Sequence, residues 1–271
     1  MPQPIIDVAT YTVVIEIGNI PVRINTSELD FVKLLQNRYE GFVSNNENCE
    51  IEFDIDLISP EPIDRDTDVE VRYTDGRWSM RRGDFRAEWD PKTRRGWIRQ
   101  TPNPYSIDAV LRIIHSLVLA SHGGFLLHSA SAIRNGRAYL FAGVSEAGKT
   151  TISKLAPSDV TLLTDEISHV RRSGDGYVAH GTPFTGELAK LGENVSAPVA
   201  TLYLLAKGKV NRIDRLSAAE ATRSILANLL FFAKDEDLVQ RVFHSVFHFV
   251  SRVPVARLMF VPDARVWELI G

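Results

Sequence analysis

The sequence predicts a mixed α/β fold of the α+β type. Residues 1–103 hold short β-rich runs separated by turn signals, whereas apolar residues at helical spacing occur mainly after them. In the second part, a glycine-rich loop at Gly143–Thr150 stands between an apolar strand and a short helix. We therefore expect a mostly antiparallel, β-rich N-terminal region over residues 1–103 and an α/β core over residues 104–271.

The composition is that of an ordinary globular protein. The chain has 271 residues, of which 44% are hydrophobic and 24% are charged, so it can bury a substantial core. The net charge is −3 and no block of lysine and arginine stands out, which argues against a nucleic-acid partner. Cys49 is the sole cysteine, which excludes an intramolecular disulfide and a cysteine-rich metal site and favours a reducing cytoplasm.

Neither an export signal nor a membrane segment is expected. The first residues, Met1–Asp7, lack the charged start and apolar core of an export signal. The longest apolar runs, near residues 225–233 and 253–261, are interrupted by polar residues or proline and fall far short of a bilayer span. We expect a cytoplasmic protein without a membrane partner.

The N-terminal region is predicted to be a mostly antiparallel sheet with one helix. Residues 74–76 and 82–84 have the composition of hairpin turns. Apolar residues at helical spacing predict a helix over Leu29–Arg38. The predicted strands are Tyr11–Ile17, Cys49–Leu57, Val69–Tyr73 and Gly96–Gln100.

The core begins with a helix and a hairpin. Ser106 is predicted to cap a helix that ends at His122-Gly123-Gly124. Two strands follow, Phe125–Ile133 and Arg137–Ala142, and Asn135-Gly136 between them suits a tight hairpin because both residues tolerate positive φ. The second strand leads directly into the glycine-rich loop.

Further elements are predicted after the loop. A short helix stopped by Pro157 comes first, and the capping-box sequence Ser217–Glu220 opens a later helix that extends to about Ala233. The remaining predicted elements are strands Val160–Leu163, Ala200–Ala206 and Ala256–Val261 and a helix over Glu236–Val250.

The loop sequence, Gly-Val-Ser-Glu-Ala-Gly-Lys-Thr, fits the phosphate-binding pattern G-x-x-x-x-G-K-[ST], called a P-loop. Lys149 would reach the β- and γ-phosphates, the Thr150 hydroxyl would ligate magnesium, and Thr151 would contact the α-phosphate side. A glycine turn with a solvated lysine would not explain the strand before the loop and the helix after it. ATP or GTP with Mg²⁺ is therefore the expected ligand. The predicted nucleotide-binding residues are Gly143, Ser145, Glu146, Ala147, Gly148, Lys149, Thr150 and Thr151.

Two adjacent carboxylates, Asp165 and Glu166, follow the predicted strand Val160–Leu163. They would lie at the carboxyl edge of the sheet, where P-loop proteins hold metal and catalytic groups. We expect Asp165 and Thr150 to share one cleft and one magnesium ion, because both follow the ends of strands predicted to be neighbours. The alternative is a helix cap or a solvated turn.

From Leu126 to Glu187 the sequence resembles the HPr kinase/phosphorylase family, which shares a P-loop core with phosphoenolpyruvate carboxykinases. The resemblance rests on a histidine on the strand before the P-loop hairpin, then the loop, then two adjacent acidic residues. His128, Lys149-Thr150 and Asp165-Glu166 occupy these places. The sequence more closely resembles the divergent HPr-kinase-like proteins, whose substrates differ.

The resemblance implies a fold and roles for particular residues. The C-terminal part would be a P-loop kinase core of the HPr kinase/carboxykinase type. Asp165 would be the general base, Thr150 and a neighbouring carboxylate would hold magnesium, and Glu166 would support the site. His128 would line the phosphate site, unless it is a core histidine of an apolar strand. Family members assemble into rings or dimers, so the resemblance also allows a homo-oligomer.

Two classes of function follow. The first is an ATP- and Mg²⁺-dependent kinase that transfers the γ-phosphoryl group to a hydroxyl, either serine of a protein or peptide or a small molecule. The second is a nucleotide-binding regulatory module without phosphoryl transfer to a second substrate. Gly181–Glu187 either folds over the site, with Glu187 facing the metal or acceptor, or is a plain loop with a solvated glutamate.

Overall fold

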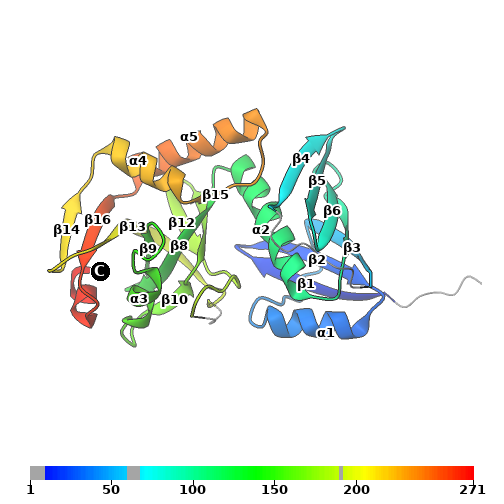
Figure 1. Cartoon of the computed structure of the whole chain (residues 1–271), viewed down its shortest axis with the longest axis horizontal. Helices are drawn as coiled ribbons and strands as arrows, with labels where there is room; N and C mark the ends of the chain where they lie inside the picture. Colours follow the sequence, from blue (N-terminus) through cyan, green and yellow to red (C-terminus); the bar gives the residue numbers. More distant parts are fainter. Residues whose placement is uncertain (1–9, 60–67, 189–191) are drawn as a thin grey trace, which may run out of the picture. The chain divides into compact units, whose positions relative to one another are not determined.

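The computed structural model describes residues 10–59, 68–188 and 192–271. The chain forms two compact units, Met1–Val110 and Leu111–Gly271, and the boundary between them falls within helix α2 (Pro104–Ser121) (Figure 1). Residues 1–7, on which the expectation of no export signal rests, lie outside the described residues. Among the helices of the described parts, none has the length and apolar character needed to cross a bilayer.

Unit 1 contains a sheet in which the described strands follow the order β1-β2-β3-β7-β6-β5-β4. The pairs β2–β3 and β3–β7 are parallel and the other pairs are antiparallel, so the prediction of a mostly antiparallel sheet is confirmed. Helix α1 spans Leu29–Arg38, as predicted. The strands are β1 (Tyr11–Ile17), β2 (Ile20–Thr26), β3 (Ile51–Leu57), β4 (Glu70–Thr74), β5 (Arg77–Arg82), β6 (Phe85–Asp90) and β7 (Arg95–Gln100).

Helix α2 starts three residues earlier than the sequence suggested, at Pro104. The Asn103 Oδ1 atom accepts hydrogen bonds from the backbone N–H groups of Tyr105 (3.0 Å) and Ser106 (3.2 Å). Asn103 therefore caps the helix, and Pro104 takes the first helical position, where no N–H is required. The prediction that Ser106 is the cap is wrong, because its hydroxyl donates instead to Asp84 Oδ2 at 2.8 Å.

Unit 2 is built on a mixed sheet whose described strands follow the order β10-β8-β11-β12-β13-β16-β14. Strand β9 pairs with β8 on one side and with β13 on the other, and β15 pairs with β8. The strands are β8 (Phe125–Arg134), β9 (Arg137–Ala142), β10 (Thr161–Thr164), β11 (Ile167–Ser173), β12 (Gly176–His180), β13 (Ser196–Lys207), β14 (Arg212–Arg215), β15 (Leu229–Leu230) and β16 (Val255–Phe260). Both units together make the fold a mixture of helices and extensive sheets, compatible with the α+β class.

The described residues of unit 2 form four helical segments besides the end of α2. The predicted capping box is present, because the Ser217 side chain accepts from the Glu220 N–H while Glu220 accepts from the Ser217 N–H. The helix that it opens ends at Ala227 and does not extend to Ala233, because Leu229–Leu230 pairs with β8 as a strand. The segments are α3 (Lys149–Lys154), α4 (Ala218–Ala227), α5 (Glu236–Arg252) and the 3₁₀ helix η1 (Ala264–Leu269).

Strand β9 is buried on both faces, which fixes the loop that follows it. On one face Leu140 packs in a core with residues of α4 and α5. On the other, Phe141 packs in a core with Ile152 of α3 and Trp267 of η1. In Figure 1, α4 and α5 lie on one side of the strands of unit 2 and α3 lies on the other.

The direction of the strands brings two loops to the same edge of the sheet. Strands β9 and β10 both run antiparallel to β8, and they pair with its opposite edges. Their carboxyl ends therefore point the same way, so the segments that begin at Gly143 and Asp165 leave the sheet at one edge. The prediction that these two strands are neighbours is wrong, because β8 lies between them.

A cluster of three buried histidines connects α2 with strands β11 and β12. The ring centroids of His115 (α2) and His169 (β11) are 5.4 Å apart, and those of His169 and His180 (β12) are also 5.4 Å apart. Within the described residues, no ring nitrogen of His115 or His169 has a hydrogen-bond partner. Burial lowers the pKa of His115 and that of His180 to about 4, and burial, with the neighbouring histidines and Arg171, holds the pKa of His169 well below 6.5.

This cluster predicts an acid-sensitive fold. Because the folded-state pKa of His115 lies below 6.5, the unfolded chain binds more protons between pH 6.5 and 4, and the free energy of unfolding falls as the pH decreases. From pH 6.5 to 5 one such histidine lowers it by about 2 kcal/mol. The variant His115→Leu should lose that part of the pH dependence, measured by urea unfolding at about pH 7.5 and about pH 5.

The exposed His244 on α5 provides the control, and His244→Gln should keep the wild-type pH dependence. An unchanged pH dependence in His115→Leu would contradict the proposed role of the buried imidazole.

Candidate functional site

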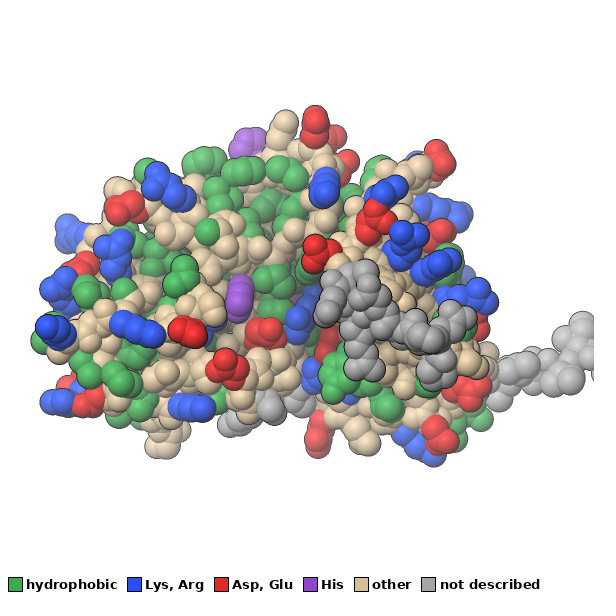
Figure 2. Space-filling model, viewed as in Figure 1, with side chains coloured by type: hydrophobic (Ala, Val, Ile, Leu, Met, Phe, Trp, Pro, Cys, Tyr) green, Lys and Arg blue, Asp and Glu red, His purple; other side chains and the backbone are tan. Residues whose placement is uncertain are grey.

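A pocket of about 650 Å³ lies at the edge of the sheet where β9, β10, β13 and β16 end. It contains every predicted site residue except Gly143. In Figure 2, acidic, basic and histidine side chains gather on the face of unit 2 over the region of α3 and β8. The lining residues are His128, Ser145, Glu146, Ala147, Gly148, Lys149, Thr150, Thr151, Asp165, Glu166, Gly186, Glu187, Lys207, Gly208, Phe260 and Pro262.

The glycine-rich loop forms one wall of the pocket. It leaves β9 at Gly143 and enters α3 at Lys149, as the strand, loop and helix pattern predicted. Gly148 has a φ of 110°, and a Cβ atom there would lie 2.5 Å from Cζ of Phe260. Glu146 also has a positive φ, of 61°, a conformation in which a non-glycine residue is uncommon. The path of the loop therefore depends on glycine at position 148.

Lys149 reaches back across the loop. Its ammonium group donates a hydrogen bond to the carbonyl oxygen of Gly143 at 3.1 Å. Desolvation lowers the pKa of Lys149, and the negative charges of Glu187 and Glu166 oppose this effect. No carboxylate of the described residues forms an ion pair with Lys149. The pocket thus holds a half-buried cation whose charge is available to an anion.

The segment Gly181–Leu188 lies on the other side of the pocket from the loop. It is hydrogen-bonded to Asp165 and to Thr150. Asp165 is buried, and its carboxylate accepts one hydrogen bond at each oxygen, from the backbone N–H groups of Gly186 and Leu188, both at 2.9 Å. Glu187 Oε2 accepts a hydrogen bond from the Thr150 hydroxyl at 3.0 Å. Glu187 therefore belongs to the site, and Asp165 is neither a helix cap nor a solvated turn residue.

Two threonine hydroxyls hold the first part of this segment against the sheet. Thr182 Oγ1 donates to the carbonyl oxygen of Ile167 at 2.8 Å, and Thr164 Oγ1 donates to that of Phe184 at 3.3 Å. Phe184 is buried. These contacts deliver Gly186 and Glu187 to the edge of the pocket.

Glu166 points toward an arginine of helix α2. The Arg112 Nη2 atom lies 3.1 Å from Glu166 Oε2, and the Arg112 guanidinium stacks over the Phe184 ring with a separation of 5.0 Å. Both charged side chains are partly buried, at 25% and 29% exposure, so their attraction is screened less than that of a surface pair. Asp165 and Glu166 are adjacent in sequence but have different partners.

His128, on strand β8, faces the pocket. Its side chain is exposed, so the alternative of a core histidine is wrong. Desolvation lowers the pKa of His128 below 6.5, and the positive charges of Lys149 and Arg112 lower it further. At neutral pH its imidazole is therefore uncharged, with one N–H donor and one nitrogen acceptor.

The oxygen atoms of the pocket suit a hard divalent cation. Thr150, Asp165 and Glu187 supply hydroxyl and carboxylate oxygens, which Mg²⁺ prefers. In the described parts of the chain, no group of three or more His, Cys, Asp or Glu side chains forms a complete metal site. Such an ion would therefore need oxygens from the ligand, as is usual for Mg²⁺ in phosphate-transferring proteins.

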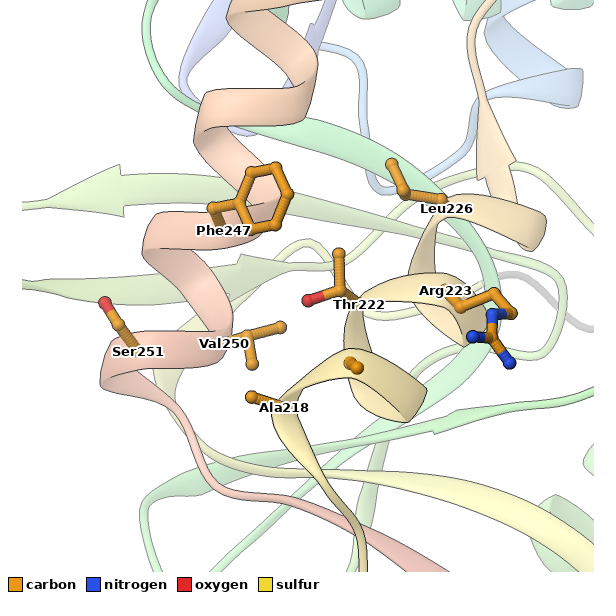
Figure 3. Close-up of a pocket in the computed structure, with 8 residues that line it drawn as sticks. Ala218, Thr222, Arg223, Leu226, Phe247, Val250 and Ser251 are labelled. Atoms are coloured by element: carbon orange, nitrogen blue, oxygen red, sulfur yellow. The ribbon is translucent and has the colours of Figure 1, made fainter.

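A second groove, between α4 and α5, has a different character. Its volume is about 460 Å³, and Arg223 is the one charged residue that lines it. Figure 3 shows Phe247 and Val250 of α5 facing the side of α4 that bears Thr222 and Ala218. It contains none of the motif residues, so the polar pocket is the candidate site.

The structure is thus a mixed α/β fold in which a glycine-rich loop, two lysines and four carboxylates lie at one edge of a sheet. Residues 103–271, more than half of the chain, match the family described as SynChlorMet cassette protein ScmC, and the chain belongs to that family. No protein of curated function gives a significant match.

Among solved structures, the chain has a weak similarity to the HPr(Ser) kinase/phosphatase from Coxiella burnetii. The sequence identity is 13%, and the similarity covers 54% of this chain and 85% of that chain, with a TM-score of 0.30. At this TM-score the similarity carries no argument about the site.

Several residues at the site were not found from the sequence. Lys207 and Gly208 directly follow the predicted strand Ala200–Ala206, so the rule that sites lie at carboxyl ends of strands could have indicated them. Phe260 and Pro262 likewise lie at the end of β16. Arg112 had no such signal, because it lies in the middle of a helix.

The bonds to Asp165 give a direct prediction for the variant Asp165→Ala. Loss of two hydrogen bonds to a charged acceptor should release the segment around Gly186, since each such bond contributes about 1.5–3 kcal/mol. Hydrogen exchange at the amides of Gly186 and Leu188 should become at least about tenfold faster. The matched control Asp175→Ala, in the exposed turn between β11 and β12, should leave both amides unchanged, and equal protection in the two variants would refute the anchoring role.

Proposed function

We propose that this chain is an ATP- or GTP-binding, Mg²⁺-dependent kinase that transfers the γ-phosphoryl group to a hydroxyl. The acceptor hydroxyl would be a serine of a protein or peptide, or a group of a small molecule. One observation supports the proposal most strongly: the Lys149 loop shares a single pocket with His128, Asp165, Glu166 and Glu187. This pocket combines groups that bind phosphate, metal and an acceptor proton.

Binding would begin with the loop. An entering triphosphate offers Lys149 anionic oxygens in place of the neutral carbonyl of Gly143. A phosphate oxygen adds the attraction of opposite charges to the hydrogen bond, so this exchange favours the ligand. The loop residues from Ser145 to Gly148 would supply backbone N–H groups to the β-phosphate.

A magnesium ion would bind between the loop and the acidic wall. The Thr150 hydroxyl, which donates to Glu187 in the free protein, would turn its oxygen toward the ion. A carboxylate oxygen of Asp165 or Glu187 would complete the protein ligands, and β- and γ-phosphate oxygens would supply others. The ion, when bound, would neutralise charge that develops on the transferring phosphoryl group.

Asp165 would also accept the proton of the attacking hydroxyl. Its two backbone hydrogen bonds use two of about four lone-pair positions on the carboxylate, so acceptor capacity remains. The same bonds fix the orientation of the carboxylate, which general-base catalysis requires. Uncharged His128 would line the γ-phosphate side, where it can donate a hydrogen bond.

A nucleotide-binding regulatory module is the second candidate, and the contacts of Thr150 and Asp165 favour it. Both side chains bind the Gly181–Leu188 segment. Ligation of metal by Thr150 would replace its bond to Glu187 and free that part of the segment, which alters the surface without any phosphoryl transfer. Incubation with γ-labelled ATP, with and without cell extract, separates the candidates. Label on an acceptor supports the kinase, and binding without transfer supports the module.

The variant Lys149→Ala should bind Mg·ATP at least about 100-fold more weakly, because the loop loses the cation that faces the phosphates. The fold should persist, since the ammonium makes one hydrogen bond to the loop. Calorimetric titration measures the affinity. The control Lys154→Ala removes an exposed lysine from the same helix and should bind normally, whereas wild-type affinity in folded Lys149→Ala would refute the phosphate-binding role.

The variant Asp165→Asn separates transfer from binding. Asparagine keeps the size and one acceptor oxygen but cannot take the proton, so ATP affinity should stay within about tenfold, or about 1.4 kcal/mol. The transfer rate at saturating Mg·ATP should fall by about 10²- to 10⁴-fold. Single-turnover transfer to the identified acceptor is the measurement, with Asp175→Asn as control. A wild-type transfer rate in Asp165→Asn would refute the role of Asp165 as the general base.

A further inference from the structure

Arg112 lies outside the pocket but contacts two of its walls. The residue sits on α2 within unit 2, where its Nη2 atom pairs with Glu166 and its guanidinium plane covers the ring of Phe184. Its Nε–H group is buried and has no hydrogen-bond partner among the described residues. A charged side chain placed at this cost in desolvation is expected to have a specific role.

The first wall is Glu166. This carboxylate lines the pocket on the same side as Asp165, and its charge acts on Lys149. An entering triphosphate would meet the negative charges of Asp165, Glu166 and Glu187 together. The ion pair with Arg112 offsets one of them and directs the Glu166 carboxylate toward α2.

The second wall is the Gly181–Leu188 segment. The Arg112 guanidinium covers the ring of Phe184, and the Thr164 hydroxyl donates a hydrogen bond to the backbone carbonyl of Phe184. Two residues further along the chain, the Gly186 N–H binds Asp165. A planar guanidinium can stack on an aromatic ring and pair with a carboxylate at once, whereas lysine lacks the planar group.

We propose that Arg112 is a positioning residue of this site: it turns Glu166 away from the phosphate position and braces Phe184, which keeps Lys149 available to an anionic ligand. The inference deepens the proposed function and rests on it for the identity of the ligand. Without Arg112, the Glu166 carboxylate loses this ion pair, and its charge at the pocket wall is no longer offset from α2. It then competes with the phosphates for Lys149 and repels them.

This role predicts a suppression between two substitutions. Arg112→Met removes the charge at similar length, and Mg·ATP affinity should fall by about tenfold. Adding Glu166→Gln removes the exposed carboxylate, so the double variant should recover to within about threefold of Glu166→Gln alone. Arg212→Met, which removes an exposed ion-paired arginine of β14, is the control and should bind normally. Calorimetric titration of the wild-type protein, the two single variants at positions 112 and 166 and the double variant gives the coupling between these two residues.

A second measurement does not require nucleotide. The histidine resonances of the free protein, followed by NMR across pH, should show a higher pKa of His128 in Arg112→Met, because a nearby cation is gone. A loss of stability alone would not change the pKa of His128, and the substitution Glu166→Gln would not suppress it.

Arg112→Lys keeps the charge without the planar stack. It should keep most of the ATP affinity while exchange at the Gly186 amide becomes faster.

Wild-type affinity in Arg112→Met, or a double variant as weak as Arg112→Met, would overturn the proposal. If Arg112→Met fails to fold, Arg112→Lys decides: unchanged exchange at Gly186 overturns the bracing of Phe184. If wild-type protein does not bind Mg·ATP, the proposed function fails by itself. The pKa of His128 and the exchange at Gly186 in nucleotide-free protein then still test the position of Arg112.

Discussion

The site depends on the two hydrogen bonds that the Asp165 carboxylate accepts from Gly186 and Leu188. They join the end of β10 to a segment about twenty residues later in the chain, and this places Glu187 against Thr150 of the loop. A carboxylate is suited to this task because each oxygen can accept a backbone N–H while further lone pairs stay free. The Asp165 side chain thereby holds the Gly181–Leu188 segment in place and can still accept further hydrogen bonds.

Charge balance makes the acidic wall compatible with the proposed anionic ligand. Four carboxylates and two lysines line the pocket, but Arg112 neutralises Glu166 from outside and Asp165 is bound by two N–H dipoles. The negative charge that still acts on Lys149 comes mainly from Glu187, the larger of the two carboxylate effects on it. A divalent cation placed between Glu187 and the phosphates would cancel this charge, so metal and nucleotide would bind more favourably together than apart.

The sequence predicted the features that neighbouring residues determine. The helix Leu29–Arg38, the Asn135-Gly136 hairpin and the loop before α3 were all correct, because spacing and positive φ specify them locally. Long-range pairing was not accessible in this way. Leu229–Leu230 was read as helix because apolar residues alone do not reveal a pairing with β8, about a hundred residues earlier, and the place of β8 between β9 and β10 was missed for the same reason. The role of Arg112 at the site could not be predicted from the sequence, because its partners lie far away in the chain.

In the free protein, two single hydrogen bonds occupy the positions where the proposed ligand would bind. Lys149 donates to a neutral carbonyl, and the Thr150 hydroxyl donates to Glu187. Each bond contributes about 0.5–3 kcal/mol, so both can be exchanged for bonds to phosphate and metal at little net cost. The strong contacts, at Asp165 and Arg112, do not need to break for that exchange. The proposed binding would therefore require little rearrangement of the pocket walls, so the loss of conformational entropy would fall mainly on the ligand and on these two side chains.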